Sequence, residues 1–216
     1  MSTQPLKKAA VLGAGSMGHG IAQLLVMTGT EVTMVDINDD ILGKARQKIQ
    51  WSLEKFVEKR TIRKEDAEAA LARLHTTTSM DEAFKDADLI VEAAPENLEM
   101  KKKLFAQIDR IAPKHAILGS NTSTLSITEL GKVTSRPDKV VGLHFFNPPQ
   151  MMPLLEIIKG AQTSEETTKF ALDLAKKLGK TPVLVKKDVR GFIVNGILAA
   201  VFNEAFWAVD RKEATR

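Results

Sequence analysis

The sequence predicts an α/β protein with a doubly wound, mostly parallel Rossmann-type sheet. Two observations lead to this fold class. Short apolar runs rich in β-branched residues recur along the chain and have the length of buried strands. Segments with the period of amphipathic helices lie between these runs, and strands that alternate with helices are typical of parallel sheets.

The expected strands are, in chain order, Ala9–Leu12, Val32–Val35, Leu89–Ala93, Ala116–Leu118, Val140–Phe145, Leu154–Ile158 and Pro182–Val185. Helical periodicity runs from Met17 to about Thr28, then through Leu104, Ile108 and Ile111, then through Ala171, Leu174 and Leu178. For the last of these helices, Thr163 and Glu166 have the spacing of a capping box. Gly179 stands where its left-handed end is expected.

One stretch without a strand-like run interrupts the alternation. Helical periodicity continues from Asp40 to about Leu74, which predicts an inserted helical hairpin over residues 40–74.

The last long helical segment, from Phe192 to Val209, is mostly apolar on every face. Such a helix needs partners on all sides. Asn195, Asn203 and Glu204 interrupt it, so we expect a helix buried in protein and not a membrane span. We therefore expect one domain over residues 1–188 and the first helix of a truncated second domain over 189–216. The residues that cover this apolar helix would come from another subunit or from beyond this chain, which predicts a homodimer or a domain-exchanged oligomer.

Composition and charge exclude several classes of protein. Lys and Arg number 31 against 27 Asp and Glu, a formal net charge of +4, so binding to nucleic acid through bulk charge is not expected. The absence of cysteine excludes disulfides, a thiolate nucleophile and cysteine-based metal sites. No metal-binding motif and no G-x-S-x-G elbow occurs. The first residues have neither a secretory signal nor an arginine-rich leader, which predicts a cytoplasmic protein that does not act at a membrane.

A glycine-rich turn follows the first expected strand. Gly13-Ala14-Gly15-Ser16-Met17-Gly18 has the spacing G-x-G-x-x-G and leads directly into an amphipathic helix. The first glycine permits the turn, the second lets the backbone approach a pyrophosphate, and the third lets helix and strand pack closely. Asp36 ends the second strand, where a carboxylate accepts from both ribose hydroxyls and repels a 2′-phosphate. The turn therefore predicts a dinucleotide site that prefers NAD to NADP, against the alternative of an ordinary glycine loop.

A histidine and a glutamate form the candidate catalytic pair. His144 lies near the carboxyl end of the strand Val140–Phe145, at the edge of an open α/β sheet where ligands bind. Glu156 is a single carboxylate inside the apolar strand Leu154–Ile158, and a buried carboxylate needs a partner. If the two strands are neighbours, the pair can act as a base and its orienter. The alternatives are a structural core histidine and a solvent-facing Glu156 on an edge strand. The other histidines, His19, His75 and His115, are expected to be structural or solvated.

Together these segments resemble the NAD-dependent L-3-hydroxyacyl-CoA dehydrogenase family, which includes 3-hydroxybutyryl-CoA dehydrogenases. The resemblance covers essentially the whole chain. It is carried by the glycine motif, Glu96-Asn97-Leu98-Glu99-Met100-Lys101, Ser120-Asn121-Thr122-Ser123, Gly142-Leu143-His144-Phe145-Phe146-Asn147-Pro148 and Gly191-Phe192-Ile193-Val194-Asn195.

The resemblance implies a role for each matching residue. His144 would take the proton from the substrate 3-hydroxyl as hydride moves to NAD, and Glu156 would orient it. Ser123 would bond the reacting oxygen or the nicotinamide side, and Asn195 would help to hold the substrate. The implied cofactor contacts are Gly13, Gly15, Ser16, Met17, Gly18, Asp36, Glu96, Lys101, Ser123 and Asn147. From the residues alone, Glu96 and Lys101 can also be a solvated helix start, and Asn147 a turn residue.

The resemblance also implies an acyl-CoA partner. Ser52 and Lys59 match the positions with which family members bind the CoA moiety on the helical hairpin, although charged helix faces are usually only solvated. Two alternatives stay open. One is an NAD-binding fragment with little turnover, because a closing domain is missing. The other is a related hydroxy-acid dehydrogenase of the L-gulonate type.

Overall fold

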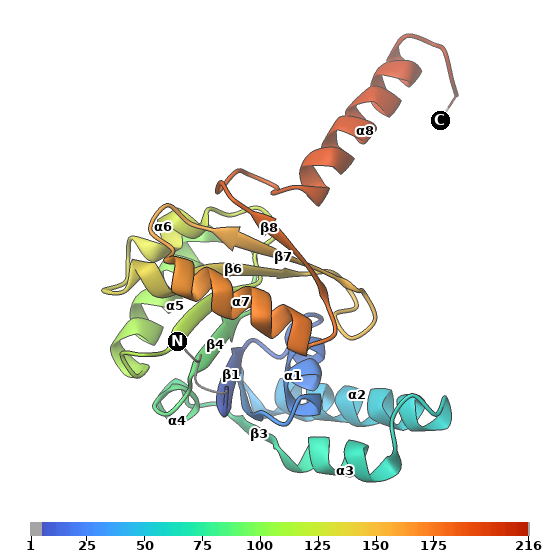
Figure 1. The fold of residues 1–216 in the computed structure, drawn as a ribbon. Helices are drawn as coiled ribbons and strands as arrows, with labels where there is room; N and C mark the ends of the chain where they lie inside the picture. The colour runs from blue at the N-terminus through green and yellow to red at the C-terminus, as the bar shows by residue number, and fades with distance from the viewer. Residues whose placement is uncertain (1–5, 216) are drawn as a thin grey trace.

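An eight-stranded sheet forms the centre of the protein in the computed structural model, which describes residues 6–215 (Figure 1). The strand order is β3-β2-β1-β4-β5-β6-β7-β8, and all neighbours are parallel except β6 and β7. The strands are β1 Lys8–Leu12, β2 Glu31–Val35, β3 Leu74–Thr77, β4 Leu89–Glu92, β5 Ile117–Ser120, β6 Val140–Phe145, β7 Leu154–Lys159 and β8 Thr181–Val185. The doubly wound, mostly parallel fold class is confirmed.

Helices cover both faces of the sheet. They are α1 Gly18–Met27, α2 Asp39–Glu58, α3 Lys64–Ala72, α4 Met80–Phe84, α5 Leu98–Ile111, α6 Ile127–Gly131, α7 Glu165–Lys177 and α8 Val194–Asp210, with a 3-10 turn at Pro137–Lys139. The apolar core has one cluster on each face. One contains residues of α1, α2 and α7, and the other contains residues of α4, α5 and α6.

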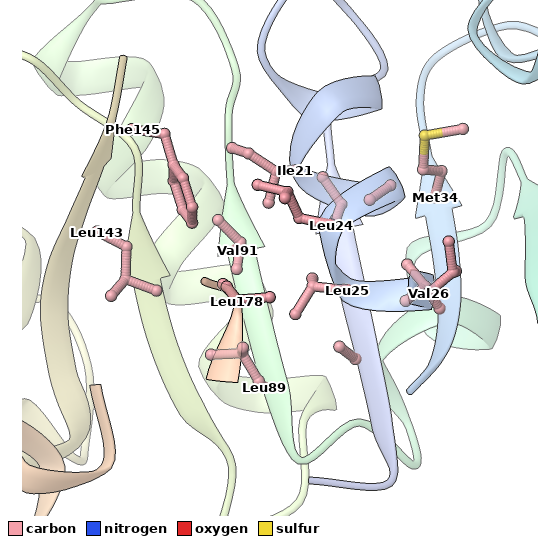
Figure 2. Close-up of a cluster of buried hydrophobic side chains, with 14 of the residues drawn as sticks. Ile21, Leu24, Leu25, Val26, Met34, Leu89, Val91, Leu143, Phe145 and Leu178 are labelled. Atoms are coloured by element: carbon pink, nitrogen blue, oxygen red, sulfur yellow. The ribbon is translucent and has the colours of Figure 1, made fainter. Parts of the chain in front are cut away.

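The first cluster fixes the position of α1 against the strands (Figure 2). Ile21 and Leu25 of α1 are buried with Val91, Leu143 and Phe145 from the sheet. Complete burial of each such side chain contributes about 1.5–3 kcal/mol. This packing holds the amino end of α1 at the carboxyl edge of the sheet, where the glycine turn lies.

The helical hairpin is confirmed, and its end needs a correction. It consists of α2 and α3, but Leu74 starts the edge strand β3 and does not end the hairpin. The strand Leu74–Thr77 escaped prediction because its sequence LHTT offers a single aliphatic residue and its middle residues are exposed. An edge strand needs only one partner, here β2, so the apolar run that marks a central strand is missing.

The predicted cap of α7 is also wrong by one residue. Ser164 accepts the hydrogen bond from the Thr167 amide, at 3.1 Å, and is the N-cap. Thr163 instead donates to the Val140 carbonyl, at 2.6 Å, and accepts from the Gly160 amide. Gly179 has the expected left-handed backbone, with φ of +70°.

Helix α8 projects away from the sheet (Figure 1). The predicted helix is confirmed, and none of its residues is buried within the described part of the chain. Its exposed apolar side chains are Ile197, Leu198, Val201, Phe202, Phe206 and Trp207. The expected cover does not come from residues 6–215. No helix in this range has the length and apolar character that crossing a bilayer requires.

Candidate active site

The glycine turn joins β1 to α1 and is shaped by close backbone contacts. Gly13 has φ of +97°, and a Cβ there would lie 2.7 Å from the Ala93 carbonyl oxygen. A Cβ on Gly18 would lie 1.7 Å from the Gly13 oxygen, whereas a Cβ on Gly15 would meet nothing within 4 Å. Gly13 and Gly18 are therefore required by the fold. Gly15 leaves open space beside the turn, as a bound pyrophosphate needs.

The amino end of α1 and Asp36 complete this part of the site. Met17 is the N-cap of α1 and makes no side-chain capping bond, so the first amides of the helix have no side-chain partner there. Amides at a helix start that lack a side-chain cap favour an anion. The Asp36 carboxylate accepts from the amides of Ala14 and Ile37, each at 2.7 Å, and so ties the turn to the end of β2. Each carboxylate oxygen keeps a further lone pair for a ribose hydroxyl. These residues fit the adenosine and pyrophosphate parts of NAD.

Lys101 is buried, so its alternative interpretation as a solvated helix residue is wrong. Its ammonium lies 2.5 Å from the Glu92 carboxylate and 3.0 Å from the Ala94 carbonyl oxygen. Glu92, at the end of β4, also accepts from Ser120 Oγ at 2.7 Å. Both charged side chains are at most 1% exposed. The opposite charges and hydrogen bonds compensate the cost of burial and fix the carboxyl ends of β4 and β5 relative to α5.

Glu96 organises the turn that carries Ser123. Its Oε1 accepts from the Thr122 hydroxyl at 2.6 Å and from the Ser123 and Thr124 amides at 2.9 and 3.1 Å. Partial burial favours a raised pKa for Glu96. These hydrogen bonds and the nearby Lys101 charge outweigh it, so the pKa of Glu96 lies below its ordinary value. The carboxylate is therefore ionised and holds the Ser123 turn in place.

The structure brings His144 and Glu156 together. They are directly paired residues of the antiparallel strands β6 and β7, so their side chains lie on the same face of the sheet. His144 Nδ1 lies 2.7 Å from Glu156 Oε2, and the residues are 4% and 0% exposed. The solvent-facing alternative for Glu156 is wrong. Because Nδ1 is bonded to the carboxylate, the free ring nitrogen is Nε2.

Two phenylalanines contact the imidazole. The ring centre of Phe146 lies 4.5 Å from that of His144, and the ring centre of Phe192 lies 5.6 Å away in an edge-on arrangement. Phe192 is buried and belongs to the core cluster that contains α4, α5 and α6 residues. The imidazole therefore has a charged partner at one nitrogen and apolar neighbours around its ring.

The second oxygen of Glu156 connects the pair to helix α8. Glu156 Oε1 accepts from the amides of Ile193 and Val194, at 3.1 and 2.9 Å, where the helix begins. A carboxylate at this position satisfies amides that have no partner within the helix. One residue further on, Asn195 Nδ2 lies 3.4 Å from the Ser123 carbonyl oxygen. This contact brings Ser123 and Asn195 together, although they are 72 residues apart in the sequence.

The remaining predicted residues lie outside these contacts. Asn147 is exposed in the turn after β6. Ser52 is 6% exposed on α2, and its hydroxyl accepts from Gln23 Nε2 at 3.0 Å. Lys59 is exposed at the end of the same helix. His19, half-buried, bonds the Gly15 carbonyl oxygen, while the exposed His75 and His115 pair with Glu31 and Asp88.

Sequence reasoning assigned no role to several residues that build the site. Glu92 and Ser120 surround Lys101, and Asn121 Oδ1 accepts from the Phe145 amide at 3.0 Å, next to His144. Lys180 donates to the carbonyl oxygens of Pro149 and Met152 and holds the turn after β6, and burial lowers the pKa of its ammonium. Glu92 could have been detected from the sequence, because it is a charged residue at the end of an apolar run. Glu156 was found by the same kind of signal, a charge inside an apolar run.

A G-x-G-x-x-G turn with open space beside it and a buried histidine–carboxylate pair at one edge of a Rossmann-type sheet are the features of an NAD-dependent dehydrogenase. Residues 8–189 match the family model described as 3-hydroxyacyl-CoA dehydrogenase, NAD binding domain. The chain therefore belongs to the 3-hydroxyacyl-CoA dehydrogenase family, and its cofactor is NAD.

Named relatives and solved structures agree with this assignment. The chain is 42% identical over 216 residues to the mitochondrial hydroxyacyl-coenzyme A dehydrogenase of Rattus norvegicus, a match that covers 98% of this chain and 68% of the relative. It is 40% identical over 204 residues to a probable 3-hydroxybutyryl-CoA dehydrogenase of Bacillus subtilis, covering 94% of this chain and 70% of that protein. The crystal structure of (S)-3-hydroxybutyryl-CoA dehydrogenase from Ralstonia eutropha superimposes with a TM-score of 0.93 at 42% identity, covering 98% of this chain and 74% of that one.

Proposed function

We propose that the protein transfers hydride between an L-3-hydroxyacyl-CoA, such as 3-hydroxybutyryl-CoA, and NAD, giving the 3-oxoacyl-CoA. His144 is the general base of this reaction and Glu156 orients it. The 2.7 Å contact between His144 Nδ1 and the fully buried Glu156 carboxylate carries the proposal. An acyl-CoA substrate is consistent with the names of the relatives.

The proton chemistry follows from the bonding of the imidazole. The carboxylate accepts a hydrogen bond from the Nδ1–H group, so Nε2 keeps its lone pair and can take the proton of a substrate hydroxyl. The imidazolium that results is stabilised by Glu156, and the apolar rings of Phe146 and Phe192 limit competing solvent. When bound, NAD supplies the hydride acceptor. In the reverse direction, protonated His144 returns the proton to the carbonyl oxygen.

Ser123 and Asn195 are proposed to hold the reacting part of the substrate. The Asn195 side-chain amide donates to the Ser123 backbone carbonyl, which brings the two residues together, and the Glu96 bonds keep the Ser123 turn rigid. The proposed cofactor contacts are Gly13, Gly15, Ser16, Met17, Gly18, Asp36, Glu96, Lys101, Ser123 and Asn147. Of these, Glu96 and Lys101 already have protein partners, so their main effect is to fix the shape of the cofactor site.

The CoA contacts and the assembly are proposals of the same kind. Lys59 offers an exposed ammonium for a phosphate, whereas the buried Ser52 hydroxyl already accepts one bond from Gln23 and keeps its proton and one lone pair for the ligand. The family model ends at residue 189, which supports a boundary between residues 188 and 189. The apolar side chains of α8 support a homodimer or a domain-exchanged oligomer in which this helix is covered.

The proposal is tested by following NADH oxidation with acetoacetyl-CoA at saturating concentrations, with NADH binding measured in parallel. Turnover that saturates with acetoacetyl-CoA supports the function. NADH binding without turnover would identify the chain as a cofactor-binding unit only. Turnover with a free hydroxy acid such as L-gulonate, and none with the thioester, would assign the second alternative.

A further inference from the structure

Residues 188–193 form a turn that leads into α8, and this turn and the first residue of the helix contact both His144 and Glu156. Gly191 and Phe192 both have left-handed backbone, with φ of +77° and +52°. Glycine adopts this conformation readily, but a phenylalanine does so rarely and only where its surroundings impose it. The chain therefore holds Phe192 in a strained conformation beside the candidate base.

The side chain of Phe192 gains buried contacts from this conformation. It is 4% exposed, and its ring edge faces the His144 imidazole at 5.6 Å between centres. Phe146, from the strand end that carries His144, provides the other aromatic neighbour at 4.5 Å. Within residues 6–215, Phe192 is thus the only aromatic contact of His144 that lies outside the β6 strand and the turn after it.

The backbone of the same turn serves Glu156. Once the chain has passed through Phe192, the amides of Ile193 and Val194 point at Glu156 Oε1. The turn is anchored on its other side by Asp188, which accepts from Ser126 Oγ at 2.6 Å and from the Thr128 amide at 2.8 Å. One short segment therefore braces the imidazole, holds its carboxylate partner and starts the helix that carries Asn195.

We propose that the left-handed Gly191–Phe192 turn is the positioning element of the His144–Glu156 pair, with Phe192 as its positioning residue. A single hydrogen bond at Nδ1 still allows the imidazole to tilt about that bond. The Phe192 ring removes this freedom and so fixes the direction in which Nε2 points, while the two amides fix Glu156. The inference rests on the proposed role of His144 and adds the part of the chain that aims it.

Three substitutions separate the contribution of the ring from that of the backbone. Phe192→Gly removes the ring and keeps a residue that prefers the left-handed conformation. Gly191→Ala keeps the ring and strains the backbone, because a residue with a side chain disfavours a φ of +77°. Its Cβ would make only an ordinary contact, 3.5 Å from Asn195 Cβ, so the strain is not steric crowding. Phe192→Leu keeps most of the apolar volume. Phe170→Ala, on α7 and packed against the opposite core cluster, is the matched control for loss of a phenylalanine ring.

The main readout is the low-field proton resonance of the His144 Nδ1–H group, a measurement that needs no turnover. The resonance is assigned by its loss in His144→Gln. Thermal unfolding and NADH affinity are measured for every variant, and kcat and KM with acetoacetyl-CoA for the full chain. We expect Phe192→Gly to broaden the resonance and to lower kcat by about 10- to 100-fold, with KM and NADH affinity unchanged. Gly191→Ala should also broaden the resonance, because the strained turn shifts the two amides that hold Glu156. Phe192→Leu should stay within about threefold of the parent kcat.

Parent-like resonance and kcat in both Phe192→Gly and Gly191→Ala would overturn the inference, as would equal effects in Phe170→Ala. If Phe192→Gly does not fold, the resonance of Gly191→Ala decides alone. Failure of the proposed function is distinguished by His144→Gln. If that variant keeps full turnover, His144 is not the base. If it is inactive while the Phe192 variants are fully active, only the positioning role is wrong.

Discussion

Replacement of Glu156 by glutamine provides the sharpest test of how the pair works. The side chain keeps its shape, but one carboxylate oxygen becomes an NH₂ group. The site offers two backbone amides on one side and one imidazole nitrogen on the other. The remaining oxygen is expected to face the two amides, since the opposite orientation would leave three donors facing one another. The NH₂ group then donates to His144 Nδ1 and forces the proton onto Nε2.

In that tautomer Nε2 has no lone pair for the substrate hydroxyl, so the base is lost although the geometry is kept. We expect kcat to fall by about 10³- to 10⁴-fold, up to the loss of about 10⁴ associated with a wrong histidine tautomer. At about 1.36 kcal/mol per decade, this is about 4–5.5 kcal/mol of barrier. NADH affinity should stay unchanged, because Glu156 makes no contact with the glycine turn.

Two measurements check this reasoning. Steady-state reduction of NAD with L-3-hydroxybutyryl-CoA, the direction in which His144 acts as the base, gives kcat and KM, and nitrogen chemical shifts of the His144 ring give the tautomer. A Glu156→Gln protein that keeps its proton on Nδ1, or whose kcat falls by less than about tenfold, would refute the tautomer argument.

Three further predictions address the cofactor side of the site. Gly15→Ala should leave the unfolding midpoint unchanged and weaken NADH binding at least about tenfold. Gly18→Ala should also lower the unfolding midpoint, because its Cβ would lie 1.7 Å from the Gly13 oxygen. Equal unfolding midpoints for the two variants would contradict this contact. Lys101→Met should lower the free energy of unfolding by about 3–5 kcal/mol, since it leaves Glu92 buried without its partner, and Lys101→Met with Glu92→Gln should recover much of this in urea unfolding; no recovery would argue against the pair. The pKa of Glu96 is lowered in the folded protein. Its contribution to stability is therefore present above the pKa of the unfolded state, near 4.3, and is lost as pH falls through the folded pKa. Hydrogen exchange of the Ser123 amide should show reduced protection only at acid pH in the unsubstituted protein, and at all pH values in Glu96→Gln.

Much of the fold followed from local sequence patterns. Buried parallel strands and amphipathic helices carry strong periodic signals, and the glycine turn fixed the first βαβ unit. The edge strand Leu74–Thr77 carried no such signal, because its two middle residues are polar and exposed. The cap at Ser164 was misplaced because Thr163 has a similar hydroxyl, and only the neighbouring Val140 carbonyl shows which of the two faces the helix.

The site was predictable where a charge interrupts an apolar run. Glu156 was found in this way, and the same criterion applied to Leu89–Ala93 would have found Glu92. The partner of Lys101 could not be read from its helix, since Glu92 and Ser120 lie on two other strands. The turn at Gly191 and Phe192 was also beyond reach, because a left-handed phenylalanine is imposed by tertiary contacts and not by local preference.

The central claim is that His144 exchanges the substrate proton, and His144→Gln tests it most directly. NADH oxidation with acetoacetyl-CoA is measured for this variant and the parent, together with NADH affinity. We expect a loss of several orders of magnitude in kcat with nearly unchanged NADH affinity. A kcat equal to that of the parent would contradict it and place the base on another residue.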